Sequence, residues 1–215
     1  VVHEVAEFLA SEKPESFWRY VELTHDARGA DARLGSDRQC VDAALARAAR
    51  LLPGALAPVL SLSLSVREYS PRLAAHRSAA MALPGGAPRG CCAARVGGQV
   101  VTRLERLSAA IEAEAARAHG DRSCSSAGGG SGSSGADAGE SAAAAAQGSW
   151  LEPTSSGLGQ VYPAAGSSST AAVAVEFFAT PGASCFGAFH TALKAAAESG
   201  SVRYTLLQYA GEECV

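Results

Sequence analysis

The chain has 215 residues and a formal net charge of −3, from 18 basic and 21 acidic residues. This length allows one large or two small domains with a hydrophobic core. The balanced charge argues against a basic nucleic-acid-binding or membrane-surface protein, and no apolar run approaches the roughly 18 residues of a membrane-spanning helix. The sequence begins without Met or a charged-then-apolar leader, so we expect a processed chain or a fragment.

Apolar residues at helical spacing predict helices in the first part of the chain. Pro14 suits the first turn of the second of these helices, which contains Trp18. A polar loop is expected at 25–38, and helical spacing returns from Val41 to Leu60. The apolar positions of the first two helices are Val5, Phe8, Leu9, Phe17, Trp18 and Val21.

The stretch VLSLSLSV, residues 59–66, carries conflicting signals. Its apolar residues alternate with Ser, which is typical of a strand. Leu56, Leu60 and Leu64 nevertheless also fall at the i, i+4 spacing of one helix face. Because no partner strand is evident in the neighbouring sequence, the interpretation favours a helix.

Two more helices are predicted before the middle of the chain. Ser70 and Pro71 supply a cap and a first-turn residue for a helix that continues through Met81. A Pro-Gly-Gly turn follows it. The pattern of residues 99–118 predicts a further amphipathic helix, with Ile111 on its apolar side.

Residues 119–149 consist mostly of Gly, Ser and Ala, with hardly a large apolar side chain. Such a segment cannot bury enough surface to offset its chain entropy, so a disordered insertion is predicted. The stretch 153–170 has a similar composition, but Val161, Tyr162 and Pro163 could anchor it to the core.

The last quarter of the chain changes character. A strand is predicted at 172–179, a helix at 184–198 and a second strand at 202–209, with Gly200 as the helix stop. This order fits one right-handed βαβ unit with parallel strands. The chain is therefore expected to belong to the α+β or α/β class.

Six cysteines are present, and they argue against a zinc site. None forms a Cys-x-x-Cys pair, and no His lies at ligand spacing from them. Their even number is compatible with disulfides in an oxidising compartment. A bond between adjacent residues is not expected, and one of the adjacent pair could bond elsewhere, for example with Cys40 or Cys124, so the pairing stays open. The cysteines are Cys40, Cys91, Cys92, Cys124, Cys185 and Cys214.

Cys185 lies where a strand and a Pro-Gly turn lead into a helix, an outline that resembles a thioredoxin active site. A thiol at a helix N-terminus gains from the helix dipole. In the dithiol mechanism, however, the attacking thiol is the first cysteine of the motif, and that position here is Gly182. We therefore interpret Cys185 as a small buried or half-buried cysteine, and a redox site is the alternative.

Other candidate catalytic pairs are not supported by their spacing. His190 follows Cys185 by five residues and falls on another helix face, so a Cys–His nucleophilic pair is not expected. Glu112 and Glu114 lie two residues apart and point to different faces of a helix, so they form no carboxylate dyad.

A charged cluster surrounds Tyr69 and consists of Arg67, Glu68 and Arg72. It could bind an anion, but a solvated network at a helix terminus is the favoured interpretation. The Gly-rich segment 128–135 contains no Gly-Lys-Ser/Thr and does not join a strand to a helix, so it is not a phosphate loop. No catalytic constellation results from these residues.

Several stretches together resemble the N-terminal region of the UDP-glucose:glycoprotein glucosyltransferase family. They are EVAEFLASEKPESFWRYVE (4–22), LSLSVREYSPRLAAHRSAA (62–80), PRGCCA (88–93) and AVAVEFFATPGASCFGAFHTAL (172–193), and VRYTLLQY (202–209) fits the strand that follows. The resemblance implies the first thioredoxin-like domain of that family, with a large helical insertion and without a redox Cys-x-x-Cys. Strands expected before Val1 and after Tyr209 are missing, so the sheet should be incomplete at both ends.

On this resemblance the chain has three parts. Residues 1–118 form the N-terminal helical part and the helical insertion, 119–170 the disordered insertion, and 171–215 the C-terminal βαβ unit. Family members pair the cysteine matching Cys91 with one about a dozen residues later, where this sequence has none, and Cys92 is additional.

The resemblance implies a non-catalytic folding-sensor domain, or a fragment of one, from an enzyme of the endoplasmic reticulum lumen. That enzyme transfers glucose from UDP-glucose to glycans on misfolded glycoproteins, using a divalent metal in a separate catalytic domain with no counterpart here. The chain alone should therefore be inactive as a transferase and hold no cofactor. Its implied partners are misfolded glycoproteins and the other domains of the parent enzyme, with no nucleic acid and no membrane insertion.

Two alternatives remain: a thiol-disulfide oxidoreductase acting through Cys185, and a truncated helical interaction module. No catalytic, cofactor-binding or metal-binding residue is predicted. Large apolar side chains are expected in the core rather than in contact with clients, and these are Phe8, Trp18, Phe186 and Phe189.

Overall fold

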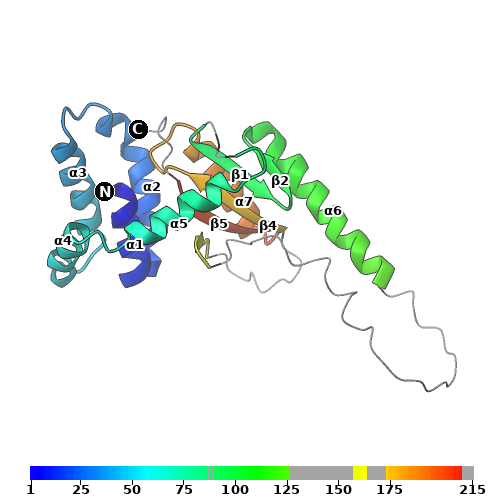
Figure 1. Ribbon diagram of the computed structural model, residues 1–215, viewed down its shortest axis with the longest axis horizontal. Helices are drawn as coiled ribbons and strands as arrows, with labels where there is room; N and C mark the ends of the chain where they lie inside the picture. Colours follow the sequence, from blue (N-terminus) through cyan, green and yellow to red (C-terminus); the bar gives the residue numbers. More distant parts are fainter. Residues whose placement is uncertain (87, 89, 126–156, 164–172, 210–215) are drawn as a thin grey trace, which may run out of the picture.

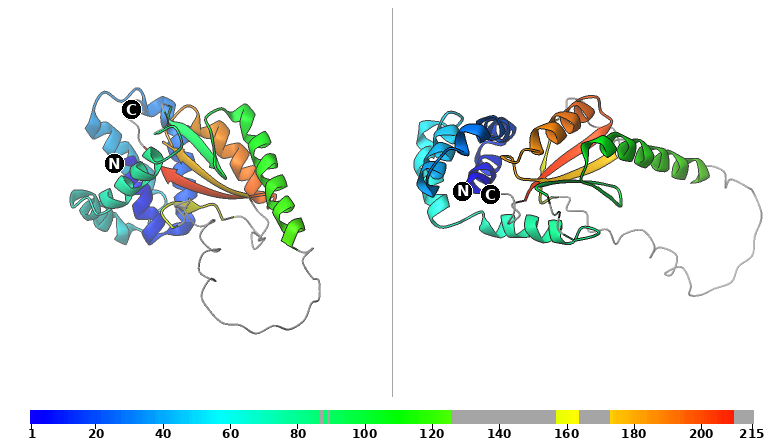
Figure 2. Two further views of the ribbon diagram at one scale, coloured as in Figure 1. Left: turned by 45° about the vertical axis from the view of Figure 1, so that its right-hand side comes forward. Right: turned by 90° about the horizontal axis from the view of Figure 1, so that it is seen from above.

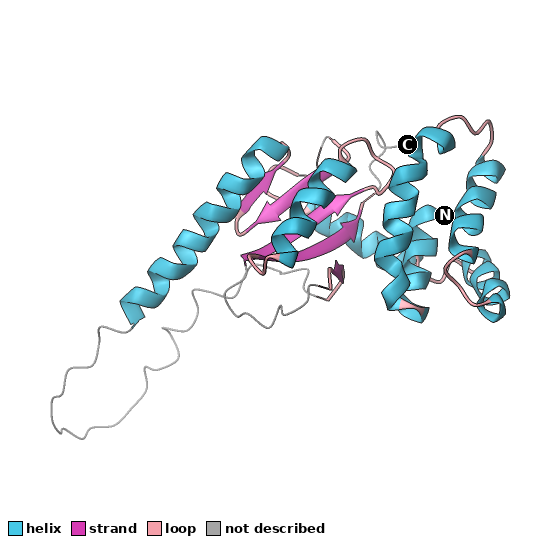
Figure 3. Cartoon of the chain, turned by 180° about the vertical axis from the view of Figure 1, so that it is seen from behind, coloured by secondary structure: helices cyan, strands magenta, loops and turns pink. Residues whose placement is uncertain are grey.

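The computed structural model describes residues 1–86, 88, 90–125, 157–163 and 173–209, with 120–125 described by their backbone alone. A group of N-terminal helices lies beside a mixed β-sheet, and a long helix projects from the opposite end of that sheet (Figure 1). Seen from behind, the strands lie between these two helical regions (Figure 3).

Five helices form before residue 82, as the apolar spacing predicted. The prediction of a helix over 59–66 is confirmed, because residues 57–65 are helical and continue a short 3-10 turn at Gly54–Leu56. The helices are α1 (Val2–Glu12), α2 (Pro14–Asp31), α3 (Asp37–Ala49), α4 (Ala57–Ser65) and α5 (Ser70–Met81).

The polar loop predicted at 25–38 was wrong over its first half, because α2 continues to Asp31. Its last turn is held by Arg47 of α3, whose guanidinium donates to the Asp31 carboxylate at 2.9 Å. The Arg47–Asp31 pair joins α3 to α2, and the polar residues at the end of α2 do not by themselves predict it. The Ser70 hydroxyl likewise donates to Glu4 at 3.2 Å instead of capping α5.

The sheet has five strands in the order β2-β1-β4-β5-β3. Parallel strands β4 and β5 are joined by α7 (Phe186–Glu198), with Phe177 opposite Leu206, which confirms the predicted βαβ unit. The other pairs are antiparallel, and the sheet ends on the short edge strands β2 and β3. The strands are β1 (Cys92–Val96), β2 (Gln99–Val101), β3 (Gln160–Val161), β4 (Val173–Ala179) and β5 (Val202–Gln208).

The helix predicted over 99–118 was wrong at its start, because residues 99–101 form β2. Helix α6 (Leu107–Ser125) begins only after a 3-10 turn at Leu104–Arg106. Gly97 and Gly98 form a two-residue hairpin turn between β1 and β2, and Gly97 has a φ of 55°. Only glycine adopts this conformation freely, so this pair of glycines was the available signal.

The core lies on both faces of the sheet. Helices α6 and α7 cover one face, and α5 lies on the other (Figure 2). Alternation along β4 sends Phe177 towards Phe186 and Phe189 of α7, whereas Phe178 packs with Leu207 on the α5 side. The predicted core side chains Phe8, Trp18, Phe186 and Phe189 are all buried, which confirms that prediction.

The predicted anchor of the thin stretch is confirmed by two contacts. The Trp18 indole donates to the Val161 carbonyl at 3.3 Å, and the Tyr162 ring meets the Trp18 ring edge-on at 5.1 Å. Of the segment predicted to be a disordered insertion, 126–156 and 164–170 lie outside the described residues. Helix α6 continues through its first residues to Ser125.

Candidate functional site

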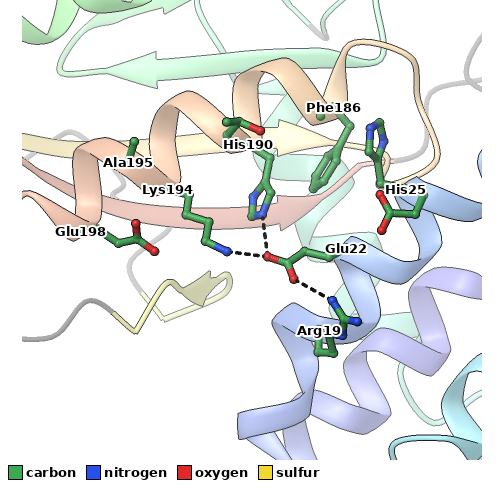
Figure 4. A pocket seen from close by; sticks show the side chains of 11 residues that line it. Arg19, Glu22, His25, Phe186, His190, Lys194, Ala195 and Glu198 are labelled. Carbon is green, nitrogen blue, oxygen red and sulfur yellow. Dashed lines mark hydrogen bonds and ion pairs between the residues drawn. The ribbon is translucent and has the colours of Figure 1, made fainter.

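A half-open cleft of about 400 Å³ lies between α2 and α7 (Figure 4). Both helices contribute ionisable side chains to it, and Phe186, Gly187, Thr191 and Ala195 complete its lining. The ionisable residues are Arg19, Glu22, His25 and Asp26 from α2, and His190, Lys194 and Glu198 from α7.

Glu22 is the centre of the polar contacts in this cleft. Its carboxylate accepts a hydrogen bond from Lys194 Nζ at 2.8 Å, and Arg19 lies 3.7 Å away. Burial alone would raise the pKa of Glu22, but the bonds from Lys194 and His190 outweigh it and lower that pKa. The hydrogen bond to Glu22 in turn raises the pKa of Lys194. Both groups therefore carry their charges at neutral pH.

His190 joins this cleft to the sheet. Its Nε2 lies 3.6 Å from Glu22, and its Nδ1 lies 3.1 Å from the Tyr204 hydroxyl. Burial lowers the pKa of His190, against the opposing effect of the Glu22 carboxylate. Because a carboxylate only accepts hydrogen bonds, we assign the proton of the neutral ring to Nε2, and the Tyr204 hydroxyl then donates to Nδ1.

Glu22, His190 and Tyr204 have the chemical order of a carboxylate–imidazole–hydroxyl triad. The hydroxyl, however, belongs to a side chain that is 0 % exposed, whereas His190 is 6 % exposed. Burial raises the pKa of Tyr204 well above its usual value of 10. A substrate in the cleft cannot reach this oxygen, so the three residues connect α2, α7 and β5 without forming a nucleophile.

Gly187 lies directly against the His25 side chain of α2. A Cβ at this position would overlap the imidazole ring of His25. That ring lies against Phe186, and its Nδ1 is 3.3 Å from the Pro181 carbonyl. A side chain at position 187 would therefore require the His25 ring to move.

Cys185, at the start of α7, forms a disulfide with Cys92 of β1, with a Cα–Cα distance of 6.1 Å. Cys185 is half-buried, as the interpretation of a buried or half-buried cysteine expected, and the disulfide supplies the pairing that the sequence left open. In the β1–β4 ladder Cys92 pairs with Ala179, which brings it to the turn before α7. The bond could not be foreseen because β1 was not predicted.

The structure excludes a disulfide to Cys40 and does not test one to Cys124. Cys40 is exposed and, among the cysteines with described side chains, it is the unpaired one, so the suggested pairing with it was wrong. Cys91 is disulfide-bonded, as Cys92 is. The side chains of Cys124 and Cys214 lie outside the described residues.

Comparison with known proteins assigns the fold. The family model described as a thioredoxin-like domain matches residues 1–213. The chain belongs to the thioredoxin-like domain family. Two curated relatives, UDP-glucose:glycoprotein glucosyltransferase 1 from Rattus norvegicus and from Mus musculus, are each 35 % identical over 88 residues, or 41 % of this chain. The aligned part spans 6 % of those relatives, and no solved structure matches.

These matches confirm the resemblance to a thioredoxin-like domain of that glucosyltransferase family and the expected fold class. In this thioredoxin-like domain the position of the first redox cysteine is the exposed Gly182, beside open space. The second position is Cys185, whose sulfur is bonded across to β1. The start of α7 therefore carries a disulfide between distant segments and no Cys-x-x-Cys pair.

A buried polar network around Glu7 escaped the sequence analysis. Glu7 is 0 % exposed, yet it accepts a hydrogen bond from Gln208 at 2.6 Å and pairs with Arg72 at 3.2 Å. His76, one turn after Arg72, contacts the Leu158 carbonyl at 2.8 Å. The i, i+4 spacing of Arg72 and His76 was the one available signal, because Glu7 lies far away in sequence.

The network around Glu7 includes one residue of the charged cluster predicted around Tyr69. Arg72 pairs with Glu7, so its charge is already balanced within the fold, whereas Arg67 and Glu68 are exposed. As the favoured interpretation held, the cluster lies next to a helix start.

The remaining candidate residues do not converge on a site. Glu114 pairs with Arg117 at 2.9 Å, whereas Glu112 is exposed. Within the described side chains, no three His, Cys, Asp or Glu residues gather in a geometry that could hold a metal ion. The described helices include none that is both long and apolar enough to cross a bilayer.

Proposed function

We propose that this thioredoxin-like domain is a non-catalytic folding sensor within a UDP-glucose:glycoprotein glucosyltransferase. The observation that carries this proposal is the Cys92–Cys185 disulfide. It holds the sulfur at the second position of the redox motif in a bond to β1, and the first position, where the attacking thiol would lie, is Gly182. The similarity to the two glucosyltransferases supports the link to glycoproteins.

The proposal divides the work between this domain and other parts of a longer enzyme. Glucose transfer from UDP-glucose, with its divalent metal, would take place in a separate catalytic domain. This domain would engage misfolded glycoproteins in the endoplasmic reticulum lumen and hold them for that reaction. The ion-paired cleft between α2 and α7 suits such a scaffold, because the Tyr204 hydroxyl beside it is buried and Glu22 forms ion pairs with Arg19 and Lys194.

A binding experiment tests this function. The purified chain is incubated with one glycoprotein in two states, native and reduced-and-carboxymethylated, and the bound fraction is measured by pull-down. The proposal expects clear preference for the unfolded state. Equal binding to the two states contradicts it.

A matched assay addresses the oxidoreductase alternative. That alternative expects the chain to accelerate reduction of insulin disulfides by a thiol reductant, and expects Cys185→Ser to abolish the acceleration. We expect no acceleration above the rate without the chain, and the same rate for Cys185→Ser and for the Cys40→Ser control, since Cys185 is bonded to Cys92.

A further inference from the structure

Helix α4 is apolar on both of its sides. Leu60 and Ser63 are buried on its inner side, where the helix packs against α1. Val59, Leu62 and Val66 point the other way and are 43 %, 63 % and 65 % exposed. We call these three side chains the outer face of α4. Their spacing of three and four residues places them in one stripe.

The outer face lies in a stretch without charge. No Asp, Glu, Lys or Arg occurs between Pro53 and Val66, whereas Arg50 and Arg67 flank the stretch on either side. A surface helix normally presents charged or polar side chains to water. A partner of this face is therefore selected by apolar contact and not by charge.

The exposed serines of α4 need no hydrogen-bond partner from a bound molecule. Ser61 Oγ donates to the Ala57 carbonyl at 3.3 Å, and Ser65 Oγ donates to the Leu62 carbonyl at 2.7 Å. Both hydroxyls are thus satisfied by the backbone of their own helix. An apolar partner can cover the outer face without leaving these donors unpaired, and no particular hydrogen-bonding sequence is required of it.

The size of the face favours a short segment over a folded partner. Nine residues make a helix about 13 Å long and about 10 Å across. This footprint is far below the roughly 800 Å² per partner that a stable interface between folded proteins buries. An extended chain rises about 3.3 Å per residue, so about four residues span the helix.

From these observations we propose that the outer face of α4 docks short, uncharged apolar segments of unfolded polypeptide. This inference rests on the proposed folding-sensor function and names its client-contact surface. A lipid surface is less well matched, because the stretch from Pro53 to Val66 has no Lys or Arg to meet lipid headgroups. A second copy of the chain is less well matched because the footprint is too small.

The test uses the full chain and a triple variant, Val59→Ser, Leu62→Ser and Val66→Ser. Met81→Ser is the matched control, because Met81 is 60 % exposed but lies on α5. Circular dichroism and thermal unfolding first establish that both variants fold. Binding is then measured to the reduced-and-carboxymethylated glycoprotein, and to a Leu/Val/Phe peptide and a version of it carrying Lys and Glu.

We expect the triple variant to bind the unfolded glycoprotein and the apolar peptide at least about tenfold more weakly than the unaltered chain does. The Met81→Ser control should bind both as the unaltered chain does. We also expect the unaltered chain to prefer the apolar peptide over the charged one. If the unaltered chain prefers the unfolded glycoprotein and the triple variant binds it equally well, the inference is overturned while the proposed function stands. If the unaltered chain shows no preference for the unfolded state, the proposed function itself fails.

Two further measurements separate the other occupants. Co-sedimentation with phosphatidylcholine vesicles tests a lipid surface, and analytical ultracentrifugation tests a second copy. The inference is overturned if the triple variant loses vesicle binding or self-association while its binding to the unfolded glycoprotein is unchanged. We expect neither vesicle binding nor self-association to depend on the outer face.

Discussion

The side chains at the start of α7 make contacts within the fold, whereas those of the outer face of α4 are exposed to solvent. At α7, Cys185 is bonded to Cys92, His190 contacts Tyr204 and Glu22, and Gly187 accommodates a side chain of α2. On α4, three large apolar side chains are exposed to solvent.

This difference shows where chemistry and recognition can occur. Contacts within the fold already take up the thiol, the imidazole and the hydroxyl near α7, so these groups contribute stability. The apolar area on the outer face of α4 is exposed to water, so its burial by a bound partner would be favourable. Changes at α7 should therefore affect folding, and changes at α4 should affect binding.

The largest effect on stability is expected from removal of the disulfide. The Cys92→Ala and Cys185→Ala double variant should lose about 4 kcal/mol of unfolding free energy, because the bond closes a loop of 93 residues in the unfolded chain. Urea denaturation measures the loss. Cys40→Ser is the control and should change little, since Cys40 is exposed and unpaired.

A smaller loss is expected from Tyr204→Phe. This change removes the hydroxyl that pairs with His190 Nδ1 and leaves a buried ring nitrogen unsatisfied, at a cost of about 1–2 kcal/mol. Tyr162→Phe is the matched control, because the Tyr162 hydroxyl pairs with exposed Glu198. Similar losses in the two variants would show that the His190 contact is not special.

Acid should also weaken the α2–α7 junction. The pKa of His190 is lowered below 6.5 in the folded chain, so the unfolded state binds more protons as pH falls below 6.5. The free energy of unfolding should therefore decrease from about pH 6.5 downwards. His190→Gln should make this decrease shallower, and His119→Gln, at an exposed residue of α6, is the matched control. Identical pH profiles for all three chains would contradict the role of His190.

The smallest effect on stability belongs to α4. The triple serine variant of the outer face should unfold within about 0.5 kcal/mol of the unaltered chain, because exposed side chains contribute little to folding. Thermal and urea unfolding measure this difference. A loss comparable to that of the disulfide variant would mean that the outer face is covered within the fold.

The elements that could be predicted from the sequence are those with strong local patterns. The aromatic and β-branched run of β4 and the apolar spacing of α7 predicted the βαβ unit, and the Leu spacing favoured a helix at α4. The short strand β1 contains Cys92, two alanines and Arg95, so its composition gave no strand signal.

The candidate sites were less predictable because they join distant segments. Lys194 and Glu22 are 172 residues apart, and Gln208 and Glu7 are 201 residues apart. The disulfide depended on β1, which was missed. That Val59 and Leu62 are exposed follows from how α4 packs against α1, and this depends on tertiary contacts that local spacing does not encode.

Hydrogen–deuterium exchange of the chain, with and without the unfolded glycoprotein, tests the central contrast most directly. The account predicts that the client slows exchange over α4 and the turn after it, residues 57–68, and leaves α7 unchanged. Slower exchange at the α2–α7 cleft, with α4 unaffected, would contradict the account and assign recognition to the cleft.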